Sequence, residues 1–184
     1  MTARTVDDLM AGATRVAGFI SRETKVTTEG CTRCDPEKIC LEATVAKIDD
    51  AGDYVADGAT EAQAIAHIAL FFRWCDERGL LSDEHTADSE LARELRKARK
   101  KESYGDYLWD NFSGKLVGDD LCDRARSFAE QRYEQFVREL GSVTGKELLT
   151  FSEQDVDFAS VAQMLDRLLE AHSLSPAKPW WKFW

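Results

Sequence analysis

The sequence predicts an all-α fold, a single helical domain of about six or seven helices. Apolar residues recur at steps of three and four along most of the chain, which is the period of a helix with one buried face. Helix-starting and helix-ending residues flank several of these stretches. The chain has three prolines in 184 residues and a hydrophobic content of 43%, which is typical of a folded protein rather than a disordered one.

The first 46 residues are interpreted as an N-terminal extension with one helix and a cysteine-containing segment. Apolar residues at helical spacing predict an amphipathic helix over Val6–Arg22. Lys25–Cys34 contains β-branched residues and a glycine, which indicates a loop or a short strand. Asp35-Pro36-Glu37 then combines a capping residue with a proline suited to the first helical position, so a helix is expected from Pro36 to about Lys47.

The main helical domain is predicted to span residues 47–172, with its most buried helix over Thr60–Arg78. This helix carries apolar residues on several sides, which is typical of a central helix. Thr60 can cap its start, and Gly79 stands where a left-handed residue commonly ends a helix. The preceding stretch, Asp49 to Ala59, contains two glycines and several acidic residues, and it is predicted to be a turn region.

Four further helices are predicted along the rest of the main domain. They cover about Ser89–Lys101, Tyr104–Phe112, Asp119 or Asp120 to Leu140, and Gln154–His172. Gly114 and Gly141 are expected to end the second and third of these helices, and Ser152 with Asp155 resembles a capping box for the last. The tail, residues 173–184, carries four aromatic residues among its last five, so it is predicted to dock on its own domain or on a partner.

The charge of the chain restricts the classes of partner. Acidic residues outnumber basic ones by 34 to 24, which gives a net charge of −10. Such a surface repels phosphate groups, so neither nucleic acid nor a membrane is predicted as a partner, whereas a basic protein is favoured. The first twenty residues contain no long apolar run, and no stretch of the sequence is apolar enough to span a bilayer. We therefore expect a cytoplasmic protein.

Three cysteines form the clearest chemical motif, Cys31-x2-Cys34-x5-Cys40. Two cysteines separated by two residues can bind one soft cation, and zinc requires four ligands. The motif supplies three, so a zinc site would need one more donor from elsewhere in the chain: Cys75, Cys122 or His67. Two alternatives stay open. The cysteines are reduced thiols without a metal, or Cys31 and Cys34 form a thiol switch, since a helix N-terminus favours the thiolate.

The sequence lacks the motifs of common catalytic mechanisms. It has no glycine-rich phosphate loop, and no serine stands in a nucleophile elbow. His67 lies in the predicted central helix, where a histidine more often belongs to the core than to an active site. Asp49, Asp50 and Asp53 lack the spacing of a calcium loop, and helix capping explains them. An enzyme of unknown reaction that uses His67 with nearby carboxylates is kept as a third hypothesis.

The middle of the chain carries a series of short motifs. They are Asp49-Asp50-Ala51, His67-Ile68 leading to Phe71-x-x-Trp74, Gly79-Leu80, Gly105-Asp106-Tyr107-Leu108, and Lys115-Leu116 followed by Asp119-Asp120-Leu121. This series resembles an uncharacterised bacterial family, a domain of unknown function, over about residues 47–140. It departs from the family pattern at Asp53-Tyr54, where a tryptophan-histidine pair is expected. Proteins that look like this often resemble the small acidic proteins that accompany bacterial toxins, so the resemblance implies an immunity protein.

Our leading functional hypothesis is a non-catalytic acidic module that binds another protein, as an immunity protein that neutralises a basic toxin. Acidic side chains would steer the encounter, and aromatic side chains would anchor the contact. The expected binding residues are Asp106, Tyr107, Trp109, Asp110, Asp119 and Asp120. The runner-up is a zinc-binding or thiol-switch protein that uses Cys31, Cys34 and Cys40. No cofactor is expected apart from that zinc.

Overall fold

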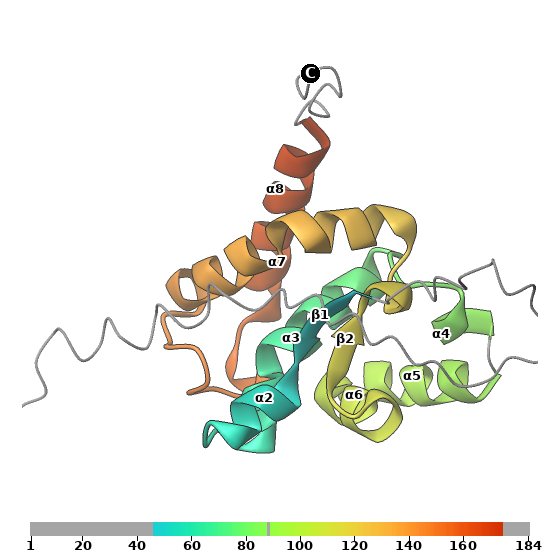
Figure 1. Ribbon diagram of the computed structural model, residues 1–184, viewed down its shortest axis with the longest axis horizontal. Helices are drawn as coiled ribbons and strands as arrows, with labels where there is room; N and C mark the ends of the chain where they lie inside the picture. Colours follow the sequence, from blue (N-terminus) through green and yellow to red (C-terminus); the bar gives the residue numbers. More distant parts are fainter. Residues whose placement is uncertain (1–45, 88, 175–184) are drawn as a thin grey trace, which may run out of the picture. The chain divides into compact units, whose positions relative to one another are not determined.

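The protein is represented by a computed structural model that describes residues 46–87 and 89–174 (Figure 1). Several predicted features lie outside these described residues. They are the helix over Val6–Arg22, the segment with Cys31, Cys34 and Cys40, and the aromatic residues of the tail. The predictions made for those parts of the chain therefore stay predictions. Lys47 is the first residue of the compact unit that contains all the elements below.

The described residues form seven α-helices and one two-stranded sheet, which confirms the all-α fold class. In chain order the elements are β1 (Lys47–Asp50), α2 (Ala51–Ala56), α3 (Glu61–Glu77), α4 (Glu84–Ala87), α5 (Ser89–Lys101), α6 (Tyr104–Phe112), β2 (Lys115–Val117), α7 (Asp123–Thr144) and α8 (Phe158–Leu174). Two short 3₁₀ turns, Gly118–Asp120 and Glu153–Asp155, precede α7 and α8. In Figure 1, α7 and α8 lie above α3, and α5 and α6 lie below it on the right.

Helix α3 is the central element of the fold, as the sequence predicts. It packs against α2, α6, α7 and α8, and nearly all of its residues from Ala64 to Cys75 are buried. Thr60 and Gln63 form a reciprocal capping box at its start. Gly79, with φ of +65°, follows its last turn in the left-handed conformation that glycine adopts without strain.

Two neighbouring phenylalanines of α3 contact two different groups of aromatic residues. Phe71 contacts residues of α3 and α7: Trp74, Phe128, Tyr133 and Phe136. Phe72 contacts residues of α4 and α6: His85, Tyr104 and Tyr107. Because adjacent residues of a helix point about 100° apart, one helix serves both halves of the core.

The two-stranded sheet is absent from the sequence prediction. β1 pairs antiparallel with β2, so that Lys47 lies opposite Val117 and Asp50 lies opposite Lys115, with an irregularity between Lys47 and Asp49. Asp50 then caps α2, its side chain accepting a hydrogen bond from the N–H of Gly52 at 3.0 Å. The predicted turn region therefore contains the end of a strand and a six-residue helix, and Lys47 is in a strand rather than at a helix end.

Two helix boundaries also differ from the prediction. Asp119 and Asp120 belong to the 3₁₀ turn rather than to α7, which continues through Gly141 and ends at Thr144. Gly145, with φ of +65°, supplies the left-handed residue after this helix. Helix α8 begins at Phe158 rather than Gln154, because the Ser152–Asp155 box closes a single 3₁₀ turn.

Candidate functional site

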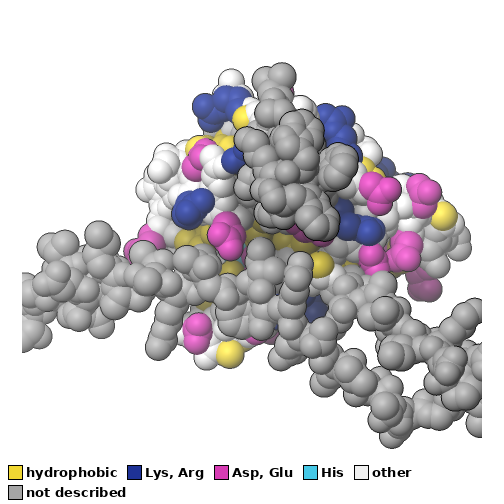
Figure 2. All heavy atoms as spheres, turned by 45° about the horizontal axis from the view of Figure 1, so that its top comes forward, with side chains coloured by type: hydrophobic (Ala, Val, Ile, Leu, Met, Phe, Trp, Pro, Cys, Tyr) yellow, Lys and Arg dark blue, Asp and Glu magenta, His cyan; other side chains and the backbone are white. Residues whose placement is uncertain are grey.

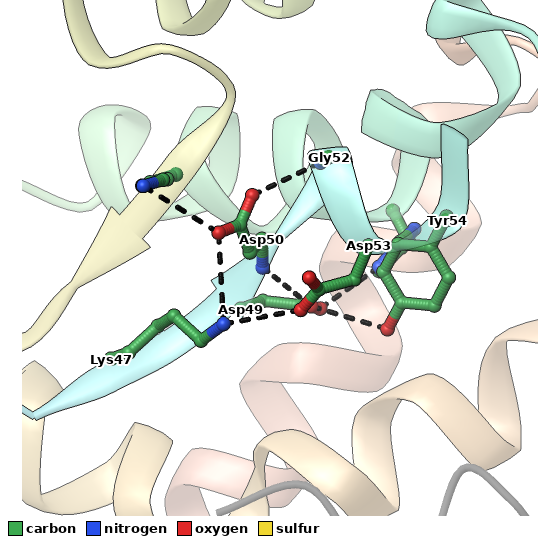
Figure 3. Close-up of polar contacts among 8 residues, drawn as sticks. Lys47, Asp49, Asp50, Gly52, Asp53 and Tyr54 are labelled. Carbon is green, nitrogen blue, oxygen red and sulfur yellow. Dashed lines mark hydrogen bonds and ion pairs between the residues drawn. The ribbon is translucent and has the colours of Figure 1, made fainter. Parts of the chain in front are cut away.

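The carboxylate of Asp49 joins four elements of the fold. Its Oδ2 atom lies 2.9 Å from Nε2 of His67 and accepts a hydrogen bond from the hydroxyl of Tyr133 at 2.8 Å. Its Oδ1 atom accepts hydrogen bonds from the hydroxyl of Tyr54 at 3.1 Å and from the N–H of Asp50 at 2.8 Å. Figure 3 shows the Asp49 side chain directed toward the hydroxyl of Tyr54. We call Asp49, Tyr54, His67 and Tyr133 the Asp49 cluster.

Local structure explains how each member of the Asp49 cluster reaches its place. Asp49 is the third residue of β1, and Tyr54 lies in α2, which begins directly after that strand. His67 lies in the second turn of α3, and Tyr133 lies on the buried face of α7. The ring of Tyr54 meets the ring of His67 edge to face, with centroids 5.0 Å apart. The phenol therefore covers the imidazole while it bonds to the carboxylate.

The electrostatics of the cluster favour an ionised carboxylate. Burial alone would raise the pKa of the Asp49 carboxyl, but His67, the Tyr133 hydroxyl and the Asp50 N–H outweigh burial and hold this pKa below its ordinary value. Burial and the neighbouring Asp49 carboxylate raise the pKa of the Tyr133 hydroxyl and of the Tyr54 hydroxyl. Both phenols therefore stay protonated and keep donating their hydrogen bonds.

His67 is enclosed by the fold. Its exposed fraction is 0%, and its Nδ1 atom is buried with no hydrogen-bond partner among the described residues. We assign the Nε2 proton to the bond with Asp49, since the ionised carboxylate can only accept. An imidazole oriented by a carboxylate is the arrangement that a general base needs, so the structure brings together the pair that the enzyme hypothesis requires. A substrate cannot contact the ring as it stands, because no part of it is accessible.

An outer layer of ion pairs surrounds the strand that carries Asp49. The Lys47 ammonium lies 3.1 Å from Asp53 and 3.6 Å from Asp50, and Lys115 lies 3.7 Å from Asp50. Figure 3 shows Lys47 reaching across to Asp53. Since Asp50 and Asp53 are paired with these ammonium groups, they do not converge on Asp49. Within the described part of the chain no group of three or more His, Cys, Asp or Glu residues is placed to hold a metal ion.

A second buried histidine forms a similar combination on the other side of α3. His85 Nδ1 lies 2.9 Å from the hydroxyl of Tyr107, and His85 Nε2 lies 3.4 Å from Oδ1 of Asp120. The other oxygen of Asp120 accepts the N–H of Val117 at 2.8 Å. Tyr107 and Asp120 are 3% and 4% exposed. Tyr107 and Asp120 are among the expected binding residues, but both complete hydrogen bonds inside the fold and leave little surface for a partner to contact.

The other expected binding residues have more access to solvent. Asp106, Asp110 and Asp119 are exposed. Asp106 accepts a hydrogen bond from the Ser103 hydroxyl at 2.7 Å, and Asp119 pairs with Arg126 at 3.1 Å. Trp109 is half-buried. Its ring packs closely on Gly114: a Cβ added to this glycine would lie 2.7 Å from the indole. Three carboxylates and part of one indole thus remain as candidates for contact with a partner.

The cysteines give no test of the metal hypothesis. Cys31, Cys34 and Cys40 lie outside the described residues, so the zinc site and the thiol switch stay predictions. Cys75 and Cys122 are free thiols. Burial raises the pKa of the Cys75 thiol well above its ordinary value, which favours the protonated form.

Sequence reasoning identifies His67 as a core histidine but misses its partners. Asp49 is 18 residues away along the chain and Tyr133 is 66 residues away on the other side. The aspartate pair Asp49-Asp50 is the one signal in the sequence for these partners. Both residues stand directly before α2, and a helix cap uses the side chain of only one of them. The second aspartate therefore needed another role, which the sequence alone did not specify.

The comparisons with known proteins identify a family for most of the chain. No helix among the described residues is both long and apolar enough to cross a membrane. No curated protein and no solved structure matches the chain. A family model described as a domain of unknown function, DUF7832, matches residues 47–156, which is more than half of the 184 residues and includes every member of the Asp49 cluster. The chain therefore belongs to the DUF7832 family, whose function is not known.

Proposed function

We propose that the protein is a non-catalytic module that binds another protein through its acidic surface. One observation supports this proposal above the others: the histidines most suited to catalysis face inward. His67 and His85 are 0% and 1% exposed, and each is paired with a buried aspartate, Asp49 or Asp120. Many of the residues exposed to solvent are carboxylates, in a chain with a net charge of −10. Such a surface suits recognition rather than bond making.

The contact surface is proposed to include Asp106, Asp110 and Asp119. Asp106 and Asp110 stand four residues apart on α6, so both lie on its exposed face. On the face of the molecule that Figure 2 shows, carboxylates lie among lysine and arginine side chains, and several of the carboxylates are toward the right-hand side. Exposed charges of one sign accelerate the encounter with a partner of opposite sign, and this effect weakens as salt screens them.

The finer form of the proposal is that the partner is a basic toxin and that this protein acts as its immunity protein. Support for this step comes from the sequence resemblance to small acidic proteins that accompany bacterial toxins. Stoichiometric binding fits it, because an inhibitor of this kind covers its target and needs no catalytic group.

The test uses the products of the genes next to this one. We expect one of them to be a basic protein that forms a one-to-one complex with the full chain and stops growth when expressed alone. Co-expression of this protein should restore growth. Stopped-flow mixing should show an association rate constant that falls by about tenfold or more between 20 and 200 mM NaCl, because salt screens the charges that steer the two proteins together.

A matched pair of variants separates local from general charge effects. The triple variant Asp106→Asn, Asp110→Asn, Asp119→Asn should slow association, whereas Glu130→Gln, Glu134→Gln, Glu147→Gln, which removes three exposed charges elsewhere, should slow it much less. Equal effects would contradict the proposed surface. If no neighbouring product binds and none is toxic, the immunity function is wrong.

A further inference from the structure

The ten residues of β1 and α2, from Lys47 to Ala56, form a strap over the buried histidine of α3. Strand β1 pairs with β2, and α2 packs on α3. Tyr54 of the strap packs against His67, with the two rings nearly perpendicular and their centroids 5.0 Å apart. Figure 1 shows β1 and α2 in front of α3. The strap is therefore part of what separates the Asp49–His67 pair from solvent.

Apolar contacts hold the strap only thinly. Ala51 is its one fully buried apolar residue, while Ile48, Tyr54 and Val55 are partly buried. Gly52, Asp53 and Ala56 are exposed. Helix α3, by contrast, buries two phenylalanines, a tryptophan and several aliphatic side chains. Segments with few buried apolar contacts open at lower free energy than the core does, so the strap should open more readily than α3.

The strongest polar attachment of the strap to the helices is the Asp49 carboxylate. Its contacts with His67 at 2.9 Å and with Tyr133 at 2.8 Å join the strap to α3 and α7. The ion pair between Asp50 and Lys115 is longer, at 3.7 Å, and the lysine side chain is half exposed, so it contributes little. The backbone N–H of Ala51 adds a hydrogen bond to the carbonyl of Gly114 at 3.0 Å. Hydrogen bonds to a buried charge are the stronger class.

The residues after the strap allow a change of direction. Gly58 has φ of +100°, a conformation that other residues rarely adopt, and no atom of the described part of the chain lies within 4 Å of the position of an added Cβ. A segment that is thinly packed, bonded to α3 and α7 through one carboxylate and followed by such a glycine can move as a unit relative to those helices.

We propose that residues 47–56 open as one unit while α3, α7 and α8 stay folded, and that the Asp49 carboxylate is the latch that keeps this strap closed. Opening separates Asp49 from His67 and gives the imidazole access to solvent, including the Nδ1 atom that has no hydrogen-bond partner among the described residues while the strap is closed. The histidine is therefore a group that the protein uncovers transiently rather than one that is permanently sealed. This inference does not depend on the proposed binding function.

Hydrogen exchange measured by mass spectrometry on the full chain tests the proposal. In the natural protein, amides of residues 48–55 should exchange at least tenfold faster than those in the middle of α3 and α7. Asp49→Asn should speed exchange in the strap by a further tenfold or more and leave α7 and α8 unchanged. Tyr133→Phe, which removes one hydrogen bond to the latch, should give a smaller increase in the same segment.

Chemical modification supplies an independent measurement. Diethyl pyrocarbonate should modify His67 faster in Asp49→Asn than in the natural protein, whereas His85, which is equally buried but lies away from the strap, should be unaffected. Asp166→Asn is the matched control, because this carboxylate joins α3 to α8 through Trp74 and Arg78. It should leave the strap unchanged.

Three results would overturn the proposal. One is that the strap of the natural protein exchanges as slowly as α3 and α7 do. This measurement does not depend on whether any variant folds. Another is that Asp49→Asn accelerates exchange equally in every element, which would make the strap part of one cooperative unit. The last is that Asp49→Asn leaves the strap unchanged.

Discussion

A buried carboxylate is stable in its charged form only when hydrogen bonds replace the water it has lost. Asp49 meets this condition with four donors: two phenol hydroxyls, one imidazole N–H and one backbone N–H. Its side chain is 10% exposed, so the environment is almost dry and each donor counts. The cluster therefore stabilises the fold while the carboxyl is ionised and ceases to do so once the carboxyl is protonated.

This balance predicts a pH-dependent contribution to stability from Asp49. The pKa of its carboxyl is lower in the folded protein than the ordinary value that applies to the unfolded chain. The stabilisation is therefore complete above the unfolded pKa, which is about 4, and is lost as pH falls through the folded pKa. We expect Asp49→Asn to lower the free energy of unfolding by about 2 kcal/mol at pH 7, and this difference from the natural protein should shrink below about pH 4.

Urea unfolding between pH 7 and pH 2.5 checks this expectation. Asp110→Asn serves as the control, since Asp110 is exposed on α6, and its curve should run nearly parallel to that of the natural protein. A difference between Asp49→Asn and the natural protein that stays constant down to pH 2.5 would show that the carboxylate charge is not what stabilises the cluster.

At the scale of elements, the contact between α3 and α6 depends on the absence of a side chain. A Cβ added to Gly105 would lie 2.9 Å from Cγ2 of Ile65, closer than real Cβ atoms come. The N–H of the same glycine donates to the Glu153 carboxylate at 3.2 Å. Gly105 thus lets the start of α6 come close both to α3 and to the 3₁₀ turn before α8.

A double-mutant cycle tests this close approach. Gly105→Ala should lower stability by about 1–3 kcal/mol through overpacking, and Ile65→Ala should lower it by about 2–4 kcal/mol by leaving a cavity. The double variant should be more stable than the sum predicts, since the smaller side chain at 65 leaves room for the added methyl group.

The control for this cycle is Gly79→Ala. Its cost comes from the positive φ, since no atom of the residues that the structure describes lies within 4 Å of the added Cβ, so it should show no coupling with Ile65→Ala. Thermal or urea unfolding gives all of these values. Strict additivity at Gly105 and Ile65 would mean that the backbones move apart instead.

The elements that the sequence predicts correctly are the helices of nine residues or more. For α3, α5 and α6 the ends agree with the prediction within a residue or so. The strands and the helices α2 and α4 have three to six residues, which is too few to show a period. β1 also pairs with a strand more than sixty residues later, and no local pattern announces such a partner.

Helix α7 shows why the ends of a helix are harder to predict from the sequence than its presence. Gly141 was expected to end it, but a glycine costs only about 1 kcal/mol inside a helix, and the buried face continues past it to Val143. The candidate site follows the same rule. His67 could be placed in the core from its neighbours in the chain, whereas Asp49 and Tyr133 join it through tertiary contacts that sequence spacing does not encode.

For the whole molecule, the net charge of −10 predicts a response to salt. Like charges on a compact surface repel one another, and salt weakens this repulsion over about 10 Å at 0.1 M. We expect the midpoint of thermal unfolding to rise by a few degrees between 10 and 200 mM NaCl. The triple variant that neutralises Asp106, Asp110 and Asp119 should show a smaller rise.

A midpoint of thermal unfolding that falls with salt would contradict this expectation. Ion pairs such as Arg99 with Asp76 and Arg78 with Asp166 are favourable contacts that salt weakens. A midpoint that falls with salt would show that these pairs outweigh the general repulsion between carboxylates. Calorimetry at several salt concentrations, with sucrose as a neutral co-solute for comparison, distinguishes the two.

Phe71 and Phe72 contact different groups of aromatic residues, and this limits where members of the family can differ in length. Because each residue of a helix adds about 100°, insertion of one residue in the first half of α3 would turn Phe71 toward the neighbours of Phe72 and Phe72 toward the direction of Arg73. A deletion would turn Phe72 toward the neighbours of Phe71. The two aromatic groups consist of different residues, so neither shift would fit. Natural insertions should therefore fall in connecting segments such as the one after Gly145, where exposed backbone can accommodate them.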